Sequence, residues 1–169
     1  MTIDWAQLAV DLHMGTATGT RYAEDALERI LGEDTITEAV ERIIDMRPGW
    51  NTAQSVLVHI RSERATLLAY DAYTVSTGDR ARAAVILIKD IAHHQAVDWV
   101  EEFLADPNLG TLGIDILDQL IWSHSLDPEN ERTGALLELA AHHPSLNVRE
   151  GAARVRALAK QWTDDITST

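Results

Sequence analysis

Seven histidines are the most obvious candidates for chemistry in this chain, and four of them form two adjacent pairs, His93–His94 and His142–His143. A carboxylate lies four residues before one member of each pair, Asp90 in the first case and Glu138 in the second. On a helix this spacing places an imidazole beside a carboxylate, as some metal sites require. However, adjacent residues point about 100° apart on a helix, and histidine also suits the negative end of a helix dipole. We therefore predict helix-end histidines and no metal ligands.

Motifs for other kinds of catalysis are missing. The chain has no cysteine, which excludes thiol catalysis and Cys-ligated zinc. It contains no Gly-x-Ser-x-Gly sequence, and its glycines lack the spacing and the following lysine of a phosphate-binding loop. We expect a protein that is not an enzyme, with no catalytic residue and no cofactor. An enzyme or metal protein that uses His93, His94 and His142 is an alternative of a different class.

The best candidate for a binding site is the stretch Ile114–Trp122, IDILDQLIW. Four of its apolar side chains can face a core: Ile114, Leu117, Leu120 and Ile121. Four polar or aromatic side chains recur at three- and four-residue spacing along the other side: Asp115, Asp118, Gln119 and Trp122. Carboxylates beside an exposed Trp are typical of a binding hot spot for a basic protein. The alternative is that Trp122 packs against the next repeat and the aspartates are merely solvated.

The charge of the chain points to the same class of partner. Its 14 basic and 27 acidic residues give a net charge of −13. Such a surface repels nucleic acids and anionic membranes, and it attracts basic proteins. We expect no nucleic-acid or membrane partner, since no apolar run is long enough to span a bilayer either. Simple solubility also explains an acidic surface, and we interpret the basic clusters (Arg80, Arg82 and Lys89; Arg149, Arg154, Arg156 and Lys160) as solvated helix faces.

The pattern of apolar residues predicts an all-α protein. Apolar side chains recur every three or four residues along the chain, without the alternation of a strand. We expect about ten helices in one domain, 1–169, with residues 1–34 as an N-terminal capping helical pair and Trp5 and Trp162 sealing the two ends. Ser62 is predicted to cap a helix over 63–75, and residues 96–105 to form one helix. Asn-x-x-Glu-like capping patterns predict three more helix starts, at Thr35, Asn51 and Asn147.

One segment occurs twice. ARAAVILIKDIA (81–92) aligns without gaps with VREGAARVRALA (148–159), which indicates repeated helix pairs. Val148, Ala152, Val155 and Ala159 form an apolar stripe in the second copy. Asn147, Val148 and Arg149 followed by Ala152 and Ala153 resemble the signature of a HEAT repeat. That resemblance implies an α-solenoid of stacked antiparallel helix pairs that binds proteins, with the second helix of each pair lining its concave surface.

The order of the segments DWAQLAVDL, AEDALERILG and GIDILDQLIW is also similar to that of small bacterial HEAT-like proteins encoded beside polymorphic toxins. This resemblance implies an immunity or antitoxin-like protein that masks a basic toxin with an acidic concave face. We expect it in the cytoplasm, because cysteine is absent and the N-terminus does not read as a signal peptide. A generic HEAT scaffold or adaptor in another assembly is the alternative.

Overall fold

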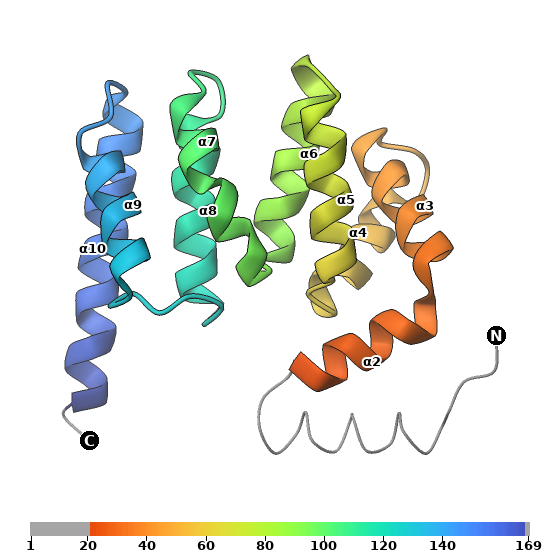
Figure 1. The fold of residues 1–169 in the computed structure, drawn as a ribbon, viewed down its shortest axis with the longest axis horizontal. Coiled ribbons are helices and arrows are strands. Elements are labelled where there is room, and N and C mark those ends of the chain that lie inside the picture. The colour runs from red at the N-terminus through yellow and green to blue at the C-terminus, as the bar shows by residue number, and fades with distance from the viewer. Residues whose placement is uncertain (1–20, 168–169) are drawn as a thin grey trace. The chain divides into compact units, whose positions relative to one another are not determined.

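The computed structural model describes residues 21–167, and only the helical backbone of residues 21–24 and 161–167 within that range. All regular structure in this part of the chain is helical, which confirms the predicted all-α class (Figure 1). The chain divides into two compact units, Met1–Leu87 and Ile88–Thr169, and the division falls inside helix α6 (Gly78–Ile91). The predicted N-terminal pair lies largely outside the described residues, as do Trp5 and the side chain of Trp162.

The first unit is organised around helix α3 (Glu33–Ile44). It packs against α2 (Arg21–Leu31), α4 (Trp50–His59) and α5 (Glu63–Thr74). Its buried side chains recur at helical spacing: Ile36, Val40, Ile43 and Ile44. One apolar face therefore serves three neighbours, and burial of that face is what holds these short helices in place.

The start of α5 is joined to α2 by polar contacts. The Ser62 hydroxyl accepts a hydrogen bond from the amide of Ala65 at 2.9 Å, which confirms the predicted cap. Glu28 of α2 accepts from that same hydroxyl at 2.5 Å and from the amide of Arg64 at 2.9 Å. A carboxylate at a helix N-terminus is favoured by the helix dipole. The first turn of α5 therefore holds α2 through the Ser62 hydroxyl and through an orphan backbone donor, the Arg64 amide.

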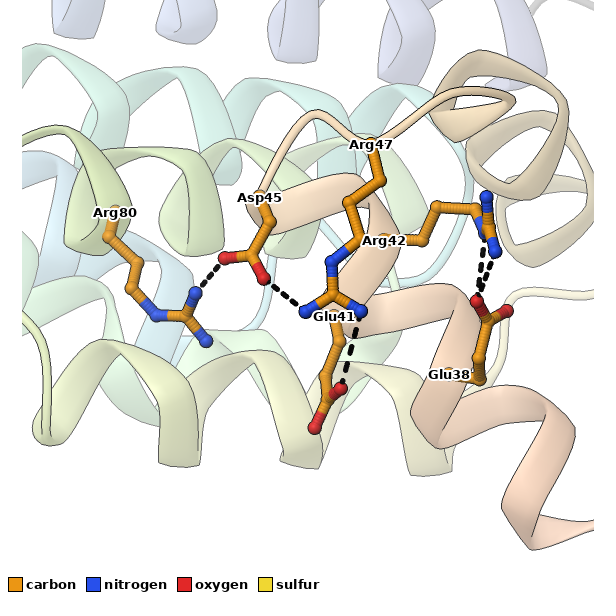
Figure 2. A network of polar contacts seen from close by, with 6 residues as sticks. All are labelled: Glu38, Glu41, Arg42, Asp45, Arg47 and Arg80. Atoms are coloured by element: carbon orange, nitrogen blue, oxygen red, sulfur yellow. Dashed lines mark hydrogen bonds and ion pairs between the residues drawn. The ribbon is translucent and has the colours of Figure 1, made fainter.

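An exposed ion network joins α3 to the first turn of α6 (Figure 2). Asp45, just after α3, pairs with both Arg47 and Arg80, and Arg47 also lies 3.7 Å from Glu41. Arg42 donates to Glu38, and this hydrogen bond lowers the pKa of that carboxyl. Exposed pairs contribute little individually. Arg80 is thus an ion-pair partner rather than the simply solvated residue that we expected.

The second unit contains two helix pairs after the last turn of α6. They are α7 (Val100–Ala105) with α8 (Gly110–Trp122), and α9 (Glu131–Ala141) with α10 (Leu146–Thr167). In addition to its pair partner, α8 packs against α10, and α7 packs against α9. The short 3-10 helix η1 (His94–Trp99) packs against α7 and α8. First helices therefore lie beside first helices in this unit, and second beside second (Figure 1).

Two glycines let these helices approach closely. A Cβ on Gly113 of α8 would lie 3.0 Å from the backbone nitrogen of Leu104 in α7. A Cβ on Gly151 of α10 would lie 3.0 Å from Cγ2 of Ile114 in α8. Val148, Ala152 and Val155 of α10 are buried, as the predicted stripe requires, whereas its fourth member, Ala159, is partly exposed.

Three predicted helix starts were wrong. The α3 helix begins at Glu33, after Gly32 (φ 77°), and α4 begins at Trp50, after Gly49 (φ 85°). Glycine in this conformation reverses the chain directly into the next helix, so Thr35 and Asn51 lie inside the first turns instead of capping them. The α10 helix likewise begins at Leu146, so Asn147 is its second residue.

The predicted helix over 96–105 is also divided, into η1 up to Trp99 and α7 from Val100. Ala96 is buried in η1, and Val100 and Phe103 are buried in α7, so the apolar pattern continues across the change of helix type. Such a continuous pattern does not distinguish one α-helix from a 3-10 turn that leads into an α-helix.

Candidate functional site

Helix α8 separates the two sets of side chains that the sequence distinguished. Ile114, Leu117, Leu120 and Ile121 are all buried, as predicted. Asp115, Asp118 and Gln119 are partly exposed, and Trp122 is exposed. We call these last four residues the α8 face. Because they recur at three- and four-residue intervals, they lie next to one another on the helix surface.

Two carboxylates of the α8 face share one guanidinium group. The Nη2 atom of Arg154, in α10, lies 3.8 Å from Oδ1 of Asp115 and 3.7 Å from Oδ2 of Asp118. Both distances exceed those of a hydrogen bond, so the contact is a loose ion pair. Sequence reasoning missed this partner, because it treated Arg154 as a member of a solvated basic cluster. The succession of helix pairs carried the missing signal, since α8 and α10 are both second helices and lie side by side.

The charge of Asp118 is disfavoured by its surroundings. Burial raises the pKa of this carboxyl above its ordinary value, and Asp115 raises it further, while the positive charge of Arg154 acts in the opposite direction. Since the net shift is upward, burial and the neighbouring carboxylate together outweigh the attraction of Arg154. The folded protein therefore keeps an acidic group that it would hold more easily in the neutral form.

Trp122 ends α8 and is 63% exposed. The prediction that it faces away from the core agrees with this exposure, whereas a core position does not. The contacts of Gly151 with Ile114 and of Arg154 with Asp118 set the register of α10 beside α8. In that register Leu158 of α10, itself 38% exposed, lies at the level of Trp122. Apolar surface is therefore available next to the carboxylates.

The first histidine pair differs from the prediction. Helix α6 ends at Ile91, and Ala92 has a φ of 53°, so Asp90 and His94 do not share a helix face. Instead, Nδ1 of His93 accepts a hydrogen bond from the amide of Gln95 at 3.3 Å and caps η1. A left-handed residue at the end of a helix redirects the chain, and the four-residue spacing could not reveal it.

The second pair combines the predicted arrangement with an unexpected one. Nδ1 of His142 lies 3.3 Å from Oε1 of Glu138, as the spacing predicted. His143 links two helix pairs, because its Nε2 is 2.9 Å from the Leu104 carbonyl and its Nδ1 accepts from the Ser145 amide at 3.0 Å. Among residues 25–160, whose side chains the structure describes, no group of three or more His, Asp or Glu residues could hold a metal ion.

Comparisons with known proteins add no family to this description. No protein-family model, no curated protein and no solved structure matches the chain. In the part of the chain that the structure describes, no helix combines the length and apolar character needed to cross a membrane. The α8 face and its neighbours in α10 are therefore the evidence on which a function must be argued.

Proposed function

We propose that this chain is a protein-binding module that masks a basic partner, in the manner of a cytoplasmic immunity or antitoxin-like protein. The α8 face is the proposed binding surface, and the mechanism is occlusion without chemistry. One observation carries the proposal: the exposed Trp122 lies one helical turn after Asp118 and two turns after Asp115, on the side of α8 opposite its buried residues. Exposed Trp residues beside polar groups are over-represented among binding hot spots.

The energetics of the α8 face support this proposal. Trp122 keeps a large apolar surface in water, although the opposite side of the same helix is fully packed. Asp118 is held where its charge is disfavoured. Trp122 gains no stabilisation from burial and ionised Asp118 disfavours folding, and a cationic, partly apolar partner would cover the ring and offset the charge. The net charge of −13 would in addition speed the encounter.

The stacking of the second unit supports a HEAT-like solenoid as the framework of this function. Second helices α8 and α10 are neighbours, as are first helices α7 and α9. The residues that carry the resemblance fit such a role: Val148 and Ala152 are buried, and Arg149 donates to the carbonyls of His143 and Pro144 in the preceding turn. In a solenoid of this kind, the α8 face would lie on the concave surface.

Co-expression with the flanking genes tests the proposal. Each open reading frame next to the gene of this protein is expressed alone and together with the wild-type chain, and growth is recorded. We expect a neighbour with a basic product to inhibit growth, and wild-type protein to restore it. Asp118→Lys and Trp122→Ala should reduce that rescue, whereas Glu150→Gln, an exposed change on α10, should not.

Two results would count against the proposal. Rescue that survives both Asp118→Lys and Trp122→Ala would exclude the α8 face as the binding surface. Flanking genes without any toxic product would remove the immunity role. In that second case a stable complex with a non-toxic neighbour would favour the alternative, a HEAT scaffold or adaptor in another assembly.

A further inference from the structure

We propose that the α8 face recognises an arginine side chain of its partner, and that Arg154 occupies the place of this arginine in the free protein. The inference rests on the proposed function and names the group that the binding surface receives. Arg154 is then a built-in competitor, which the guest arginine displaces when the complex forms.

The first argument is that the two carboxylates already converge on a guanidinium. Asp115 and Asp118 lie one helical turn apart, and oxygens of both lie within 4 Å of the same Arg154 nitrogen. This convergence is a property of α8, while the cation comes from another helix. The surface therefore holds a guanidinium group in the free protein, and a guest of the same chemistry fits the same position.

The second argument is that Arg154 occupies this position incompletely. Its contacts of 3.7 and 3.8 Å are too long for hydrogen bonds, so the carboxylates keep acceptor capacity for a closer donor. Its side chain is 57% exposed, and exposed ion pairs contribute little to stability. Two carboxylates and one guanidinium also leave one negative charge in excess at this point. An incoming cation is therefore favoured by charge, and moving Arg154 into water costs little.

The third argument selects arginine over lysine. Trp122 is four residues after Asp118, which makes it the next side chain along the same helix edge. A guanidinium plane stacks on an indole ring while its N–H groups point outward to carboxylates. An ammonium group is a compact, strongly hydrated charge and uses the ring less well. The combination of exposed Trp and paired carboxylates is therefore best matched by arginine.

Peptide titration tests the inference without knowledge of the partner. The probe is acetyl-Gly-Arg-Gly-amide, and the readout is the indole N–H resonance of Trp122, assigned with a Trp122→Phe variant. The analogues with lysine or citrulline in place of arginine measure the need for a guanidinium and for its charge. We expect saturable binding of the arginine peptide, weaker binding of the lysine peptide and none of the citrulline peptide.

Two substitutions on α10 test the competition. Arg154→Gln and Arg156→Gln remove the same charge from the same helix, but Arg156 pairs with Glu138 of α9 instead of with the carboxylates of the α8 face. Arg154→Gln should increase affinity for the arginine peptide by about threefold or more, because the competitor is gone. Arg156→Gln should leave it close to the wild-type value, and Asp118→Asn should abolish binding. Circular dichroism of each variant verifies that the helices are intact.

Several outcomes would overturn the inference. These are no shift of the Trp122 resonance at about 50 mM peptide, equal binding of the citrulline peptide, or an equal gain from Arg154→Gln and Arg156→Gln. If these occur while Trp122→Ala still abolishes rescue in co-expression, the arginine inference fails and the proposed function stands. If the peptide behaves as expected but no flanking gene is neutralised, the arginine site stands and the immunity role fails.

Discussion

At the scale of single residues, Asp118 is a side chain whose charge lowers the stability of the folded protein. Its carboxyl has a raised pKa, caused first by burial and then by Asp115, against the attraction of Arg154. A raised pKa means that the folded state binds the proton more tightly than the unfolded state does. Ionised Asp118 therefore disfavours folding at neutral pH, and this penalty disappears as the pH falls through the folded-state pKa.

Replacing Asp118 with Asn tests whether the charge of this residue destabilises the folded protein. At neutral pH the variant should be at least as stable as the wild type in urea unfolding, because the disfavoured charge is gone. The difference should shrink as the pH is lowered through the pKa of Asp118, where the wild-type carboxyl becomes neutral too. Glu150→Gln on exposed α10 surface controls for the loss of one charge from a chain of net charge −13. A clear loss of stability in Asp118→Asn at neutral pH would show that the attraction of Arg154 dominates instead.

At the scale of elements, the turn between α9 and α10 is tied to α7 by a single imidazole. His143 binds the Leu104 carbonyl and the Ser145 amide, and its ring occupies space beside Gly110, where a Cβ would lie 3.3 Å from it. Because Nδ1 accepts a hydrogen bond, Nε2 carries the proton and donates to the carbonyl. The neutral tautomer is therefore the one that fits both contacts.

Adjacent histidines provide a matched test of this contact. His143→Phe should destabilise the protein by roughly 1–3 kcal/mol, since it leaves the Leu104 carbonyl and the Ser145 amide without their partner. His142→Phe, at a side chain that is 76% exposed, should change the free energy of unfolding by no more than about 0.5 kcal/mol. Urea unfolding of both variants measures the difference, and equal effects would mean that the bridge contributes nothing specific.

Two glycines offer a comparable pair for helix packing. In α9, a Cβ on Gly134 would meet nothing within 4 Å, so Gly134→Ala should stabilise the helix by up to about 1 kcal/mol. In α10, a Cβ on Gly151 would press on buried, β-branched Ile114 at 3.0 Å. Gly151→Ala should therefore destabilise, because α8 and α10 must move apart. The melting temperatures of the two variants are compared. If Gly151→Ala melts at or above the temperature of Gly134→Ala, α8 and α10 are not closely packed at Gly151.

The elements also show what a sequence can and cannot predict. Helical spacing identified the buried side of α8, and the Ser62 cap was identified because its hydroxyl acts locally. Helix starts after Gly32 and Gly49 were missed, since the neighbouring residue types do not determine the conformation of a glycine. Arg154 was missed because a contact between α8 and α10 depends on the register of two helices. The buried face and one cap were thus predictable, whereas the conformations of glycines and the contacts across elements were not.

At the scale of the whole molecule, the excess of acidic residues is partly balanced within the fold. Arginines that looked like basic clusters pair with carboxylates, as Arg80 does with Asp45 and Arg156 with Glu138. These pairs leave the net charge at −13 but fix where positive charge lies. Under the proposed function, a basic partner would be steered by the whole surface, whereas its final position would depend on local groups such as those of the α8 face.

Binding kinetics should separate these two contributions once a basic partner has been identified by co-expression. Asp118→Lys should mainly slow association and flatten its dependence on salt, because steering acts before contact and is screened by ions. Trp122→Ala should mainly speed dissociation, at a cost of roughly 2 kcal/mol of binding free energy or more if the ring becomes desolvated in the complex.

The stability of the free Trp122→Ala variant must be measured alongside. A core Trp would cost about 3–5 kcal/mol on truncation, while a ring that is 63% exposed should cost far less. Unchanged rates in both variants, or an unfolded Trp122→Ala protein, would show that the α8 face is not the binding surface and that the acidic charge serves solubility.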